Sequence, residues 1–155
     1  MLRAARPVLL CAVVLVITVA GRGAAQAAGR QVVVPAGMSV SATLSPGIRV
    51  GDMVYASGQL GTKPGSREAP DSTIQGQTRQ ALENVKAVVE AAGTSMANVA
   101  KCTVFIVDVK DFAGMNQAYA RFFPKEPPAR STVVVAALVR ADAKVEIECT
   151  AAIPR

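Results

Sequence analysis

The sequence has no histidine and no tryptophan, and it has only two tyrosines and four phenylalanines among 155 residues. The missing histidine is the most informative absence. It excludes Ser-His and Cys-His nucleophile pairs, HExxH zinc sites and acid–base catalysis by imidazole. Any chemistry must therefore use carboxylates, Lys, Arg, Tyr, Cys, backbone groups or water.

A phosphate-binding loop is also absent from the glycine-containing stretch Ser57-Gly58-Gln59-Leu60-Gly61. This stretch has neither the GxGxxG spacing nor a following GK[ST]. The sequence is rich in hydrophobic residues, which make up 51% of the chain. A chain of this length and apolar content suits one domain with a single core.

The N-terminal segment has the pattern of a secretory signal peptide. Arg3 and Arg6 precede a mostly apolar run from Val8 to Val19, and small residues follow as far as Ala25-Gln26-Ala27. The run is shorter than the ~20 residues of a membrane-spanning helix, and Ala-x-Ala is a typical cleavage site. We expect residues 1–27 to be a signal peptide and the protein to be exported, periplasmic or secreted, without stable membrane association after cleavage. The alternative is an uncleaved N-terminal anchor.

The basic character of the chain belongs partly to that segment. The net charge is +6, from 17 basic and 11 acidic residues, and loss of Arg3, Arg6 and Arg22 with the signal peptide lowers it to +3. A charge of that size does not indicate nucleic acid as a partner. After the signal peptide we expect an irregular segment over residues 28–40 and one domain over residues 41–155.

Hydrophobic spacing predicts alternating strands and helices in the mature chain. Helices are expected from Ser72, which forms a capping box with Gln75, to Gly93, and between Asp111 and Pro124. Strands rich in β-branched residues are expected at 53–57, 101–108, 131–135 and 144–150. The order strand, helix, strand, helix, strand, strand predicts an α+β domain whose mixed sheet carries two helices on one face.

Two cysteines remain after removal of the signal peptide, Cys102 and Cys149. Each lies in an expected strand. In an oxidising compartment they can form a disulfide, and two buried free thiols are the equally good alternative.

The last expected strand has one polar face, because Lys144, Glu146, Glu148 and Thr150 alternate with apolar residues. In a sheet covered on one side, such a face ordinarily meets water. Arg130, however, follows Pro127-Pro128 at the start of the preceding strand, and adjacent antiparallel strands would bring it near Glu146 or Glu148. An arginine can then bind an anionic substrate while a glutamate positions water, although surface Arg–Glu pairs are commonly inert.

Several motifs resemble the RidA/YjgF family of reactive-intermediate deaminases, over about residues 40 to 152. They are Val54-Tyr55-Ala56-Ser57-Gly58-Gln59, Gln80-Ala81-Leu82-Glu83-Asn84-Val85-Lys86, Glu90-Ala91-Ala92-Gly93, Pro128-Ala129-Arg130-Ser131 and Val145-Glu146-Ile147-Glu148. The resemblance implies a chorismate-mutase-like α+β fold and a homotrimer with pockets at subunit interfaces. It also implies hydrolysis of small 2-imino acids, or their enamine tautomers, to 2-keto acids and ammonia, with neither a metal nor an organic cofactor.

The same resemblance implies roles for individual residues. Arg130 would bind the substrate carboxylate, and Glu146 would orient or activate the attacking water. Ser57 and Gly58 would line the pocket, the Thr132 backbone would contact the imino group or water, and Asn116 would lie at the rim. The lack of histidine is compatible with this chemistry, because an imine is already electrophilic and needs little beyond positioning and one carboxylate.

The sequence departs from the family pattern at two of these positions. Leu44 stands where studied family members have a tyrosine that lines the pocket, and Thr132 stands where many members have cysteine. Loss of the tyrosine hydroxyl implies either a preference for bulkier or more apolar imino acids or a paralogue with weak deaminase activity. The alternative function is a non-catalytic trimer that binds small carboxylates or acts as a holdase. RNA cleavage, also reported in the family, is disfavoured by the modest mature charge, the lack of histidine and the expected export.

Overall fold

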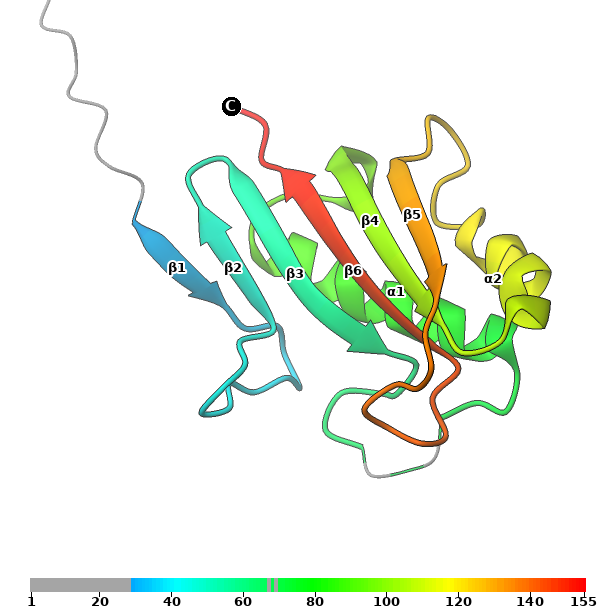
Figure 1. Ribbon diagram of the computed structural model, residues 1–155. Coiled ribbons are helices and arrows are strands. Elements are labelled where there is room, and N and C mark those ends of the chain that lie inside the picture. Colours follow the sequence, from blue (N-terminus) through cyan, green and yellow to red (C-terminus); the bar gives the residue numbers. More distant parts are fainter. Residues whose placement is uncertain (1–28, 67, 69) are drawn as a thin grey trace, which may run out of the picture.

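The computed structural model describes residues 29–66, 68 and 70–155, so the expected signal peptide lies outside the described residues. Figure 1 shows the strands and helices. The strands are β1 (Arg30–Val33), β2 (Gly47–Val50), β3 (Met53–Leu60), β4 (Val99–Ile106), β5 (Ala129–Val134) and β6 (Val145–Ala152). The helices are α1 (Ile74–Ala91) and α2 (Phe112–Tyr119), with 3-10 turns η1 (Met96–Asn98) and η2 (Val109–Asp111). None of the described helices is long and apolar enough to cross a membrane.

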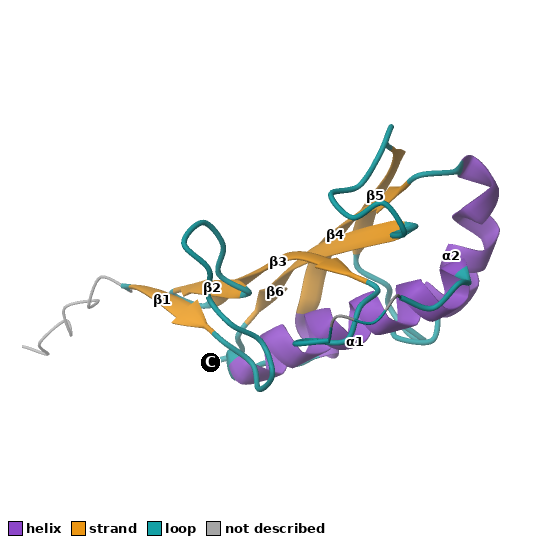
Figure 2. Ribbon diagram, turned by 90° about the horizontal axis from the view of Figure 1, so that it is seen from below, coloured by secondary structure: helices purple, strands orange, loops and turns teal. Residues whose placement is uncertain are grey.

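The six strands form one mixed sheet in the order β1-β2-β3-β6-β4-β5. Every neighbouring pair is antiparallel except β4 and β5, which are parallel. Both helices cover the same face of the sheet, as Figure 2 shows from below. The α+β prediction is therefore confirmed. Strand β1 lies within the segment expected to be irregular, and β2 had not been predicted.

Helix α1 is amphipathic, and its apolar side forms the centre of the core. Leu82, Val85, Val88 and Val89 are fully buried and belong to one cluster with the inward residues of the strands. The cap differs by one residue from the expected one: Thr73, not Ser72, accepts the hydrogen bond from the Gly76 backbone N–H at 3.0 Å.

Helix α2 is shorter than the sequence suggested. It ends at Tyr119, and Asp111 makes no side-chain capping bond. Asp108 instead caps the preceding 3-10 turn by accepting from the Lys110 backbone N–H.

Cys102 and Cys149 form a disulfide that links β4 to β6. The two residues are register partners on adjacent antiparallel strands, with Cα atoms 4.1 Å apart, and both are buried on the helix-covered face. Of the two alternatives that the sequence left open, the structure therefore has the disulfide and not two free thiols.

Candidate functional site

The sheet separates the two residues expected to act together. β4 lies between β5 and β6, so Arg130 on β5 and Glu146 on β6 are not on adjacent strands. Arg130 aligns with Cys102, whose side chain faces the helices, whereas Glu146 aligns with Phe105 on the opposite face. The expectation that adjacent strands bring Arg130 near Glu146 or Glu148 within one chain was wrong, because the two side chains leave opposite faces of the sheet.

The Glu146 carboxylate lies against a glycine in an irregular part of β3. The β3–β6 register shifts between Ala56 and Gln59, which places Ser57 and Gly58 in a bulge. A Cβ added at Gly58 would overlap the Glu146 carboxylate, so any other residue there would displace the carboxylate from this position. Burial raises the pKa of Glu146, and the nearby charge of Glu148 raises it further.

Ser57 fixes the loop that carries Leu44. Its hydroxyl donates to the Ser45 carbonyl at 2.7 Å and its backbone N–H donates to the Pro46 carbonyl at 3.0 Å. Leu44 is 57% exposed and lines, together with Gly58, a hollow of about 310 Å³. Ser57, Gly58, Leu44 and Glu146 therefore form one group of predicted site residues.

Arg130 belongs to a second group, on the helix-covered side of the β5 edge. Its guanidinium carbon lies 4.6 Å from the centre of the Tyr119 ring and 6.0 Å from that of Phe112, both on α2. In the part of the chain that the structure describes, no side chain or carbonyl pairs with the guanidinium. Arg130 is thus a half-buried cation that no carboxylate of the described residues neutralises.

Two other predicted residues share the Arg130 side of the molecule. Thr132 follows Arg130 on the same face of β5, and its hydroxyl is buried without a described hydrogen-bond partner. Asn116 is half-buried on α2. The sequence analysis named neither Phe112 nor Tyr119 as a site residue, so it missed their contact with Arg130. The signal that marks them is their seven-residue spacing, which places both on one face of a helix.

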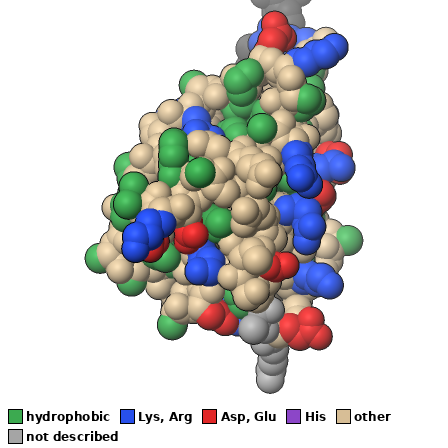
Figure 3. All heavy atoms as spheres, turned by 90° about the vertical axis from the view of Figure 1, so that its right-hand side faces the viewer, with side chains coloured by type: hydrophobic (Ala, Val, Ile, Leu, Met, Phe, Trp, Pro, Cys, Tyr) green, Lys and Arg blue, Asp and Glu red, His purple; other side chains and the backbone are tan. Residues whose placement is uncertain are grey.

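The outer side of the helices carries a further hollow of about 580 Å³, between α1 and α2, that includes none of the predicted site residues. Arg79, Lys86 and Arg121 lie along it. In Figure 3 the helices lie on the right and the uncovered face of the sheet on the left. Basic side chains gather on the right of this view, and hydrophobic side chains gather on the left. No described group of three or more His, Cys, Asp or Glu side chains is placed to hold a metal ion.

The sequence model of the family described as Endoribonuclease L-PSP matches residues 35–153 of this chain. The chain belongs to this family, which includes the RidA/YjgF proteins. The resemblance stated from the motifs is thereby confirmed at the level of the family.

Individual members of the Endoribonuclease L-PSP family are similar in sequence and in structure. A 2-iminobutanoate/2-iminopropanoate deaminase of Escherichia coli is 44% identical over 108 residues, which are 68% of this chain and 83% of the relative. The crystal structure of the YjgF gene product of E. coli superposes with a TM-score of 0.73 at 37% identity, covering 79% of this chain and 98% of that one. E. coli TdcF with bound serine superposes with a TM-score of 0.70 at 40% identity, covering 79% and 94%.

Proposed function

We propose that this protein is a hydrolytic deaminase that converts 2-imino acids and their enamine tautomers to 2-keto acids and ammonia, of the 2-iminobutanoate/2-iminopropanoate type. The observation that carries the proposal is an unneutralised arginine, Arg130, together with a carboxyl of raised pKa, Glu146, in a chain 44% identical to a deaminase of that type. The serine bound to the related TdcF is an α-amino acid, and its carboxylate is the group that a 2-imino acid also presents.

The reaction needs a cation for the substrate carboxylate and a base for water. The Arg130 guanidinium donates a bidentate pair of hydrogen bonds to the carboxylate and orients C2 of the imine. Glu146 accepts a proton from water as the water oxygen adds to C2, which gives a tetrahedral carbinolamine. Glu146 passes this proton to the imino nitrogen, which completes the carbinolamine. Glu146 then takes the carbinolamine hydroxyl proton and delivers it to the amine nitrogen, so that the C–N bond breaks and ammonia leaves as the C2 carbonyl forms. A raised pKa makes Glu146 a better base for this step than an ordinary carboxylate.

Because Arg130 and Glu146 lie on opposite faces of one sheet, a site that contains both needs two copies of the chain. We propose a homotrimer with a pocket at each subunit interface, in which one subunit supplies Arg130 and its neighbour supplies Glu146. The uncovered face of the sheet, here called the bare face, supports association, because it exposes Val50, Tyr55 and Val133 to 42%, 49% and 42%. Large exposed apolar side chains on one face are typical of interaction surfaces.

We also propose that residues 1–27 are a signal peptide and that the mature protein is periplasmic or secreted. The Cys102–Cys149 disulfide supports this location, because disulfides persist in oxidising compartments and are rare in the cytosol. An exported amino-acid oxidase is one kind of enzyme that would supply imines there. Mass spectrometry of the mature N-terminus tests the proposal. A chain beginning at or near Ala28 is expected, and a chain that retains residues 1–27 would contradict export by cleavage.

The deaminase proposal is tested by the release of ammonia and pyruvate from enzymatically generated 2-iminopropanoate, compared with spontaneous hydrolysis. The wild-type protein is expected to accelerate release, and Arg130→Ala is expected to lose the acceleration. No acceleration by the wild type, or equal acceleration by the variant, would contradict the proposal.

The second candidate function is a non-catalytic trimer that binds small carboxylates, and Leu44 at the pocket is the observation that favours it. It predicts a thermal shift with pyruvate that depends on Arg130 but is accompanied by no turnover.

A further inference from the structure

Within the described part of the chain, Arg130 is held by aromatic rings alone. The guanidinium lies over Tyr119 at 4.6 Å from the ring centre and near Phe112 at 6.0 Å, distances at which a cation is attracted to the negative face of a ring. The guanidinium has five N–H donors. None of them pairs with a side chain or carbonyl of the described residues. The rings therefore fix the position of the cation while its hydrogen-bonding capacity stays free.

The rings also leave the charge intact. A carboxylate partner would hold Arg130 as firmly, but it would occupy the same N–H groups that a substrate carboxylate needs and would repel that carboxylate. Burial raises the pKa of Tyr119 to about 12, against the opposing effect of the Arg130 charge, so the ring is neutral at physiological pH. Tyr119 consequently contributes the quadrupole of its ring without a neutralising negative charge.

Tyr119 is itself rigidly placed. It is 4% exposed, and its ring packs against Phe123 with centroids 4.8 Å apart. The Tyr119 hydroxyl is buried and makes no hydrogen bond within the described residues. The hydroxyl is therefore not what holds the ring. Its packing between Phe123 and Arg130 accounts for the position of the ring.

We propose that Tyr119, assisted by Phe112, is the positioning residue that holds the Arg130 guanidinium for the carboxylate of the substrate. The inference rests on the proposed function, because it assigns a role relative to the arginine of that same site. Tyr119 acts through Arg130 and does not touch the reacting atoms. Its contribution is to lower the cost of ordering a flexible arginine side chain when substrate binds.

The test compares Tyr119→Leu with Tyr119→Phe in the full-length mature protein, with 2-iminopropanoate as substrate and pyruvate as product ligand. Tyr119→Leu removes the ring, and its KM for the imine and its Kd for pyruvate are expected to rise about 5- to 30-fold, while kcat changes less than about 3-fold. Tyr119→Phe keeps the ring and loses only the unpaired hydroxyl, so its KM and Kd are expected to stay within about 2-fold of the wild type.

A purely structural role for Tyr119 gives a different pattern. Partial unfolding of Tyr119→Leu lowers the concentration of active enzyme, which lowers apparent kcat and leaves KM unchanged. That pattern, or an equal rise of KM in Tyr119→Phe, would overturn the inference. If Tyr119→Leu does not fold, Phe112→Leu replaces it. Phe112 is 43% exposed, and its loss is expected to raise KM about 2- to 3-fold with normal thermal stability. An unchanged KM in this variant would also count against the inference.

Failure of the deaminase proposal gives a distinct result. In that case the wild-type protein itself does not accelerate imine hydrolysis, whether or not its Kd for pyruvate depends on Arg130. The positioning role is judged when wild type is active and Arg130→Ala is not. Under those conditions a Tyr119→Leu variant with the KM and Kd of the wild type refutes the role, as do the outcomes given above.

Discussion

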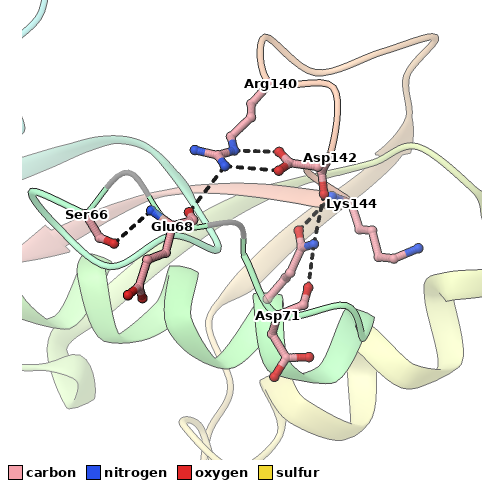
Figure 4. Close-up of polar contacts among 7 residues, drawn as sticks. Ser66, Glu68, Asp71, Arg140, Asp142 and Lys144 are labelled. Carbon is pink, nitrogen blue, oxygen red and sulfur yellow. Dashed lines mark hydrogen bonds and ion pairs between the residues drawn. The ribbon is translucent and has the colours of Figure 1, made fainter.

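Arg130 and Arg140 are both half-buried arginines in the segment between α2 and the end of the sheet, but they are held by different partners. The Arg140 guanidinium pairs with both carboxylate oxygens of Asp142 and also donates to the Glu68 carbonyl at 3.3 Å, as Figure 4 shows. Arg130 has no such partner among the described residues and rests on the rings of Tyr119 and Phe112.

The difference separates an arginine used for structure from one available to a ligand. Asp142 neutralises Arg140, and the same pairing holds the pKa of Asp142 below its usual value. The pair ties the loop after β5 to the segment before α1. Arg130 is positioned by groups that carry no charge, so its charge and its N–H donors remain for an anion.

The largest expected effect comes from replacing Arg130 with a neutral residue. Arg130→Gln is expected to lower kcat/KM for 2-iminopropanoate by about 100- to 1000-fold, because the substrate carboxylate loses its bidentate partner. Arg140→Gln, the matched control, is expected to keep kcat/KM within about 2-fold. Steady-state assays of both variants measure this, and similar losses in the two would abolish the distinction between the arginines.

The stability of the loop near Arg140 is expected to depend more on the neutral Gln77 than on the Arg140–Asp142 ion pair. Gln77 is 1% exposed, its amide nitrogen donates to the Asp71 and Asp142 carbonyls, and its amide oxygen accepts from the Lys144 backbone N–H at 2.7 Å. Gln77→Leu is expected to lower the free energy of unfolding by about 3 kcal/mol, because the buried Gln77 side chain makes three hydrogen bonds to backbone groups and the variant loses all of them. Urea denaturation measures the change. The exposed Gln75→Leu on the same helix is the control, with an expected change within about 0.5 kcal/mol.

The disulfide supports the strands on the Arg130 side. Cys102 is the register partner of Arg130 and is bonded to Cys149. The double variant Cys102→Ala, Cys149→Ala is expected to lose about 2 kcal/mol of stability, since the unfolded chain regains the entropy that the crosslink removed. Denaturation with and without reductant tests this. Reductant should destabilise the wild type and leave the double variant unchanged; a wild type insensitive to complete reduction would show that the crosslink does not contribute.

The smallest expected effect is a shift in pH dependence. In the proposed reaction Glu146 acts as a base only when deprotonated, and burial followed by the charge of Glu148 raises its pKa. The rate should therefore rise with pH through a value above that of an ordinary glutamate. Glu148→Gln removes the repulsive charge, so the acid limb of kcat/KM should move to lower pH. A limb that stays in place would show that Glu146 is not the titrating base or that Glu148 does not affect it.

Much of the fold was predictable because hydrophobic spacing is local. The apolar positions of α1 and the alternation in β6 follow directly from side-chain periodicity, and the structure confirms both elements. Strands β1 and β2 have four residues each. In strands so short, and close to Pro35, Gly37 and Pro46, alternation is too brief to recognise.

The placement of Arg130 and Glu146 on opposite faces of the sheet was not predictable from local pattern. Strands β5 and β6 follow each other in the sequence, which favours a hairpin, but β5 is parallel to β4 and lies at the edge of the sheet while β6 lies between β3 and β4. The motifs identified the family and named both residues. The faces from which they project, and the rings under Arg130, depend on contacts between distant segments that no local period encodes.

The central claim is that one subunit supplies Arg130 to a site in which its neighbour supplies Glu146. The direct test mixes two inactive variants, Arg130→Ala and Glu146→Gln, unfolds and refolds them together, and measures ammonia release from 2-iminopropanoate. Random trimers at equal amounts should recover about a quarter of wild-type activity, because one interface in four combines an intact arginine with an intact glutamate. Recovery to that level is the predicted result. No recovery from mixtures that form hybrid trimers would contradict the shared site.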